Sequence, residues 1–89
     1  MLTLTDAAGA HLTQVLMNAN AAAETAVRFI SEADRLVPKL DNQRPGDTTF
    51  DHDGKTVLVL DTDVADTLAN RTLDVTDTNA GPRLYLRED

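Results

Sequence analysis

Apolar residues recur at helical spacing near the start of the chain. One face of a helix collects positions i, i+4, i+7 and i+8, here Ala8, Leu12, Val15 and Leu16. Thr5 is a suitable N-cap, because its hydroxyl can accept a hydrogen bond from a free amide of the first turn. The pattern predicts a helix over residues 6–18 that covers an apolar surface.

Beyond the first helix the period changes from 3.6 to 2, which is typical of strands. The alternation predicts six strands, at residues 26–30, 35–40, 48–50, 55–60, 72–77 and 83–87. Asp53-Gly54 predicts a tight hairpin turn. Pro38 has no amide hydrogen, so its strand should lie at a sheet edge or carry a bulge. The unbroken apolar run at 57–60 predicts a central strand covered on both faces.

A second, short helix is expected between the fourth and fifth of these strands. The acidic and hydroxyl residues at 61–63 offer N-cap oxygens, and an apolar stripe continues to Leu68. Asn70 suits the left-handed exit of such a helix. The order of elements is helix, four strands, short helix and two strands, which predicts an α+β fold with a mostly antiparallel sheet. We expect one domain over residues 1–89, without repeats or linkers.

Composition limits the kind of core and the class of partner. Leu, Ile, Val and Phe make up 22 of 89 residues, with only three aromatic side chains, so the core must be aliphatic. Fifteen acidic residues against eight basic ones give a formal net charge of −7, and the basic residues are scattered along the chain. Nucleic acid is therefore an unexpected partner, because a phosphate backbone needs clustered Lys and Arg.

No membrane or export signal is visible in the sequence. No apolar stretch approaches the about 18 residues of a membrane span. The N-terminus lacks a basic region followed by an apolar run, so no signal peptide is expected. These features predict a cytoplasmic protein with no membrane partner, and the acidity indicates a solvated surface.

Two stretches of the chain resemble the HesB-like domain, the fold of the A-type iron–sulfur carrier proteins. Residues 2–8, followed by His11 and Leu12, resemble the first strand and first helix of that family. Residues 53–61, a short helix and residues 72–75 resemble its central hairpin, crossing helix and following strand. The resemblance implies a mixed, mostly antiparallel sheet of sandwich or barrel type, and self-association as a homodimer.

The departures from this family concern the cluster ligands. The resemblance implies three thiolates, one in a glycine-flanked loop after an early strand and two in a Cys-x-Cys near the C-terminus. The early loop corresponds to residues 31–35 here and contains neither glycine nor cysteine, and the second pair would begin at about Asp89. Soft thiolates are poorly replaced by carboxylates in cluster ligation. We therefore expect no bound cluster and no other cofactor.

Other candidate sites have structural explanations. In Asp51-His52-Asp53, adjacent strand residues point to opposite faces and Asp53 is explained by the hairpin turn, so a solvated loop is favoured over a metal site. His11 is favoured as a structural histidine beside the apolar helix face. Ser31 is the only serine and the four glycines are isolated, so neither a nucleophile with its base nor a phosphate-binding loop is found. An enzyme is not expected.

Two functional hypotheses remain open. The first is a non-catalytic, cysteine-free HesB-like domain that acts through protein–protein contact or self-association, with the edge strand of Pro38 and an outward Tyr85 as contact points. The alternative is a domain that binds a small molecule or a divalent cation. Glu32 and Asp34 are its candidate binding residues, because they stand where the family cysteine is missing.

Overall fold

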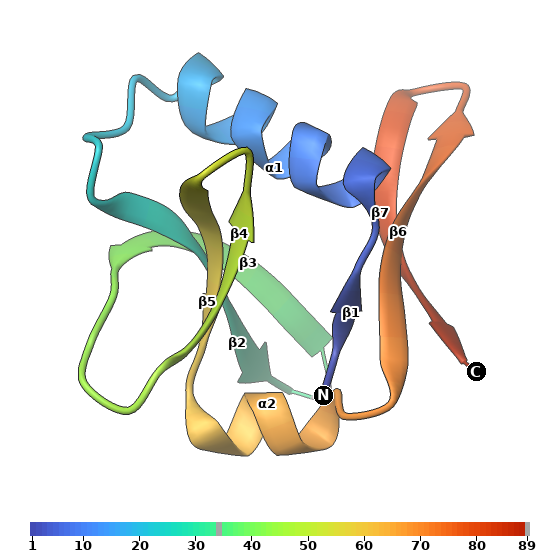
Figure 1. Ribbon diagram of the computed structural model, residues 1–89. Helices are drawn as coiled ribbons and strands as arrows, with labels where there is room; N and C mark the ends of the chain where they lie inside the picture. Colours follow the sequence, from blue (N-terminus) through green and yellow to red (C-terminus); the bar gives the residue numbers. More distant parts are fainter. Residues whose placement is uncertain (34, 89) are drawn as a thin grey trace.

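The computed structural model of the chain describes residues 1–33 and 35–88, with the backbone only at Glu88. It contains the predicted order of elements, preceded by a two-residue strand (Figure 1). The elements are β1 (Thr3–Leu4), α1 (Asp6–Asn18), β2 (Thr25–Glu32), β3 (Arg35–Asn42), β4 (Thr48–His52), β5 (Lys55–Leu60), α2 (Thr62–Thr67), β6 (Arg71–Thr78) and β7 (Gly81–Glu88).

The strands form two separate sheets, in the orders β1-β6-β7 and β3-β2-β5-β4. Hairpin neighbours pair antiparallel, whereas β1 pairs with β6 and β2 with β5 in parallel. The predicted α+β class with a mixed, mostly antiparallel arrangement is confirmed, and of the two expected forms it is the sandwich rather than the closed barrel. In Figure 1, α1 crosses one end of the two sheets and α2 lies across the opposite end.

Helix α1 begins as the sequence predicts. The hydroxyl of Thr5 accepts a hydrogen bond from the amide of Ala8 at 3.1 Å, which satisfies one free donor of the first turn. Leu12 and Leu16 are buried against the sheets. The prediction that Val15 shares this face is wrong, since its side chain is 37% exposed. The buried stripe runs through Ala8 and Gly9 instead, which turns position 15 toward solvent.

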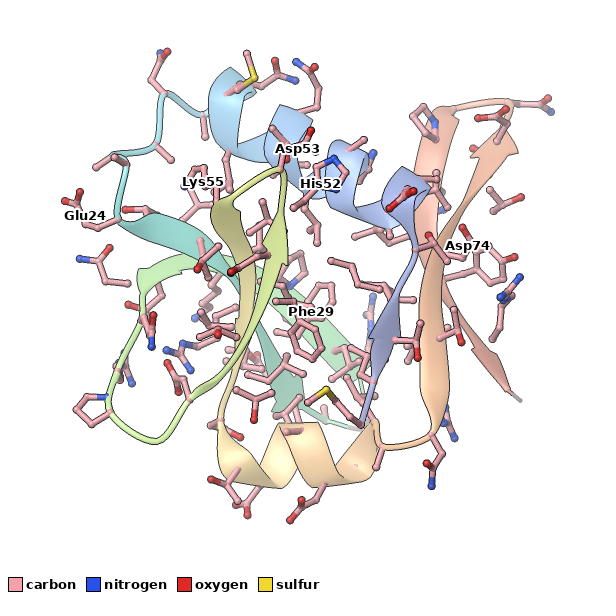
Figure 2. All side chains as sticks on the ribbon, in the orientation of Figure 1. Glu24, Phe29, His52, Asp53, Lys55 and Asp74 are labelled. Atoms are coloured by element: carbon pink, nitrogen blue, oxygen red, sulfur yellow. The ribbon has the colours of Figure 1, made fainter. Side chains whose placement is uncertain are left out.

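The core lies between the sheets and is aliphatic, as the composition indicated. Residues 57–60 of β5 are all fully buried, and β5 is an inner strand, so the predicted central strand is confirmed. Pro38 lies on β3, the outer strand of its sheet, which is the predicted edge position. Phe29 of β2 points into the space between the sheets (Figure 2).

The turns largely follow their predicted chemistry. Asp53 and Gly54 both have positive φ, 51° and 82°, as a tight hairpin turn requires. Asn70 has a φ of 66°, the left-handed exit expected after the short helix. Strand β3 extends to Asn42, two residues further than predicted, because it stays paired with β2 as far as Thr25. No helix in the described residues is long and apolar enough to cross a membrane.

Candidate functional site

The acidic loop proposed from the sequence is only partly described. Glu32 is the last residue of β2, is exposed and lies opposite Arg35 in the hairpin register. Asp34 falls outside the described residues. Across residues 1–33 and 35–88, no group of three or more His, Asp and Glu side chains is placed to hold a metal ion. Nothing in this part of the structure favours the cation-binding alternative, and it stays a prediction.

A groove of about 900 Å³ opens between the two sheets and collects side chains from α1, β2, β3, α2, β6 and β7. We call it the arginine groove. Its lining residues are His11, Phe29, Ser31, Arg35, Leu36, Pro38, Thr67, Leu68, Arg71, Leu73, Pro82, Arg83, Leu84, Tyr85 and Leu86. Pro38 and Tyr85, which the sequence offered as two contact points, therefore border one surface.

The walls of the arginine groove are basic although the protein is acidic. Arg35, Arg71 and Arg83 are three of the eight basic residues of the chain. None of the fifteen acidic residues is among the described residues that line the groove. The basic residues are scattered along the sequence, but the fold brings these three together from β3, β6 and β7. The groove thus combines positive charge with an opening into the apolar interior.

The floor of the groove is apolar and belongs to the sandwich core. Phe29, Leu68 and Leu73 are buried members of that core, and Leu84 and Leu86 pack against it while half-buried. Arg35 and Arg83 are exposed at the rim. Small-molecule and peptide sites commonly have this composition, a mostly apolar surface with a few polar groups that fix orientation.

On the other side of β2, a buried arginine forms a polar cluster that the sequence analysis missed. Arg28 is 4% exposed and donates to Asp47 at 3.0 and 2.5 Å, to Asp41 at 2.9 Å and to the carbonyl of Asn42 at 3.2 Å. Asp47 also accepts from the amide of Arg44 at 2.7 Å. The guanidinium therefore fixes the connection between β3 and β4 against the sheet.

The cluster alters the titration of its members. The hydrogen bonds from Arg28 hold the pKa of Asp47 below its ordinary value, because they stabilise the ionised carboxylate. The pKa of Asp41 is lowered chiefly by the hydrogen bond from the amide of Asn42 and also by Arg28. The same contact with Asp47 raises the pKa of Arg28. These charges satisfy one another, so the cluster is structural rather than chemically reactive.

Four of the remaining residues singled out in the sequence have structural partners. Asp51 accepts a hydrogen bond from the hydroxyl of Thr56 at 2.7 Å, and His52 lies against Gly9 of α1. Nε2 of His52 and Oδ2 of Asp53 are 3.5 Å apart at the hairpin beside α1 (Figure 2). Asp61 caps α2 by accepting from the amide of Val64 at 2.9 Å. His11 is half-buried and borders the arginine groove, and its expected structural role stays a prediction.

Comparisons with known proteins identify the fold. No family model and no curated protein matches the sequence. Three solved structures resemble the chain over nearly its whole length. Escherichia coli SufA, involved in biosynthesis of iron–sulfur clusters, has a TM-score of 0.72 and 21% identity, covering 98% of this chain and 84% of SufA. IscA with a [2Fe-2S] cluster has a TM-score of 0.68 and 18% identity, and the match covers 99% of this chain and 85% of IscA. A protein from Aquifex aeolicus has a TM-score of 0.68 and 19% identity, and the match covers 99% of this chain and 91% of the Aquifex protein.

The cluster implied by this fold does not fit the residues present. Iron–sulfur clusters are held mainly by cysteine thiolates, and the 89 residues contain no cysteine. Ser31, in the segment that corresponds to the first family ligand, is exposed on the arginine groove, and a neutral hydroxyl is a hard, weak ligand for iron in a cluster. The chain therefore has the HesB-like fold of SufA and IscA without the thiolates that hold a cluster.

Proposed function

We propose that this chain is a non-catalytic HesB-like domain that acts through protein contact and does not itself ligate an iron–sulfur cluster. One observation carries the proposal: the carrier fold extends over 98% of the chain, while cysteine is absent from it. The proposal includes a single domain over residues 1–89, a cytoplasmic location, and a protein partner or a second copy as the bound molecule.

The arginine groove supports contact as the mode of action. Pro38 borders it from β3, and Arg83 and Tyr85 border it from β7, where Tyr85 is 39% exposed. Tyrosine and arginine are the side chains enriched where proteins bind one another, because each combines a large contact area with a polar group.

Anaerobic reconstitution with iron and sulfide tests the cluster-free part of the proposal. IscA, treated in parallel, is the positive control, and the readouts are visible absorption and the iron and sulfide content after desalting. We expect IscA to hold a cluster and this chain to retain neither ion. A coloured cluster in stoichiometric amount on this chain would refute the proposal.

A further inference from the structure

The arginine groove follows the edge of one strand. Five consecutive residues of β7, 82–86, line it, although neighbouring side chains on a strand point to opposite faces. A cavity that touches both faces in succession must run along the edge of that strand. Strand β7 is the outer strand of its sheet, so this edge has no strand partner among the described residues. Such an edge offers unpaired backbone donors and acceptors to another chain.

The side chains around this edge specify the kind of chain that would fit. Arg35 and Arg83 are exposed and form no ion pair or side-chain hydrogen bond with another described residue. Leu84 and Leu86 are half-buried beside the apolar floor. A strand that enters here meets positive charge at the rim and aliphatic surface below. Its own side chains alternate between these two environments at every second residue.

We propose that the arginine groove binds an extended segment of a partner protein, in which carboxylates alternate with aliphatic side chains, as an added strand beside β7. The inference rests on the proposed function, because it names the partner chemistry of the same protein contact. Strand addition takes its affinity from backbone hydrogen bonds and its specificity from alternate side chains. The five groove residues of β7 correspond to about 17 Å of strand, so a segment of five or six residues fills the site.

A second copy of this chain is a poorer occupant than a separate partner. Within β6 of this chain, Leu73, Asp74 and Val75 show a short stretch of this alternation. Strand β6 is already paired on both sides, with β1 and with β7, so a second copy would have to break its own sheet to supply it. The net charge of −7 opposes any acidic ligand only weakly at physiological salt, where exposed charges are screened beyond about 8 Å.

Fluorescence anisotropy with designed peptides tests the proposal at 0.15 M salt. The probe is a labelled peptide of sequence Thr-Glu-Val-Glu-Val-Glu-Thr. Three matched peptides serve as controls. In the first, lysine replaces each glutamate, and in the second the composition is the same but the three glutamates are contiguous. The third carries N-methyl groups that remove alternate backbone donors. We expect saturable binding of the first peptide and at least about tenfold weaker binding of the others, because each lacks one recognised feature. Equal binding of any control peptide, or no binding of the probe, would overturn the proposal.

Charge-reversal variants locate the site. Arg83→Glu and Arg35→Glu should each weaken probe binding about tenfold or more, since each replaces an attractive charge with a repulsive one. Lys39→Glu is the matched control, because Lys39 is exposed on β3 and does not line the groove. It should bind the probe as the parent chain does. Arg83→Gln and Arg35→Gln, with circular dichroism melts of all variants, separate loss of charge from loss of fold.

Two outcomes distinguish this inference from the proposed function. If the chain holds no cluster and Arg83→Glu binds the probe unchanged, the groove assignment is wrong while the cluster-free function stands. If the chain loads a cluster, the proposed function fails whatever the peptide does. Light scattering on the same samples completes the test. A dimer that Arg83→Glu dissociates would assign the groove to a second copy and overturn the partner-segment proposal.

Discussion

Replacement of Asp47 by alanine should remove a large part of the stability of this protein. The Asp47 carboxylate is 5% exposed and holds two nitrogens of the buried Arg28 guanidinium. Without it, the guanidinium keeps Asp41 and the Asn42 carbonyl as partners but loses its least exposed counter-charge. The amide of Arg44 also loses its acceptor, but it is exposed and water can replace it.

The expected loss follows from the cost of an unpaired buried charge. Breaking a buried ion pair by removing one partner costs about 3–5 kcal/mol of unfolding free energy. Because Arg28 keeps its contacts with Asp41 and Asn42, we expect a loss at the lower end of this range, about 3 kcal/mol. A domain of this length is stable by about 4–13 kcal/mol in total. The thermal midpoint of such a domain moves by about 4–8 °C per kcal/mol, so Asp47→Ala should lower it by about 12–24 °C.

Urea denaturation followed by far-UV circular dichroism measures the loss, since the chain has no tryptophan for fluorescence. Arg28→Met and the double variant complete a thermodynamic cycle. The double variant should be less destabilised than the sum of the single variants, because it leaves no unpaired charge in the interior. Arg44→Ala is the control, because that side chain is 67% exposed and its ion pair with Asp41 should contribute little. A loss below about 1 kcal/mol for Asp47→Ala, or strict additivity, would refute the reasoning.

Three further predictions concern the pH dependence of this pair and two other contacts. Arg28 lowers the pKa of Asp47, so the stability that this pair contributes is present above about pH 4 and is lost as the pH falls through the lowered pKa. The urea midpoint of Asp47→Asn should therefore depend less on pH in that acidic range than the midpoint of the parent chain. Gly9→Ala would place a methyl group 2.5 Å from Nδ1 and 3.0 Å from Cβ of His52, so it should lower the thermal midpoint. The loss should be smaller in a His52→Gly background, where that whole side chain is absent and the better helix propensity of alanine, about 1 kcal/mol, is favourable. Thr5→Ala should cost about 1 kcal/mol in urea denaturation and Thr5→Ser much less, and equal losses would exclude the N-cap as the cause.

Local patterns in the sequence predict the helices and strands, but they do not predict how all of the strands pair. The helix at 6–18, the turn at Asp53-Gly54 and the buried run at 57–60 each depend on neighbours within a few residues, and all three are confirmed. Parallel pairing joins strands that are distant in the chain, so periodicity gives no register for it. The resemblance to the HesB-like domain, rather than the periodicity, indicated the mixed arrangement of strands.

The candidate surface was harder to predict, because distant residues build it. Arg35, Arg71 and Arg83 are separated by more than ten residues each in the sequence and meet only when two sheets pack. The burial of Arg28 could have been predicted from its place in the sequence. Arg28 is a single charge inside an otherwise apolar strand, and the turn that follows β3 ends in Asp47, a carboxylate able to pair with it.

The pairing of β1 with β6 sets a condition on the synthesis of this protein. Thr3 and Leu4 lie beside Thr72 and Leu73, and the amide of Thr5 donates to the carbonyl of Leu73 at 3.1 Å. Strand β1 can therefore find its place only after the chain as far as Leu73 has left the ribosome. Contacts of such long sequence separation also slow folding, because a large loop must close before they form. Until then the apolar face of α1 has one sheet less to cover it, and exposed apolar surface of this kind is prone to aggregation.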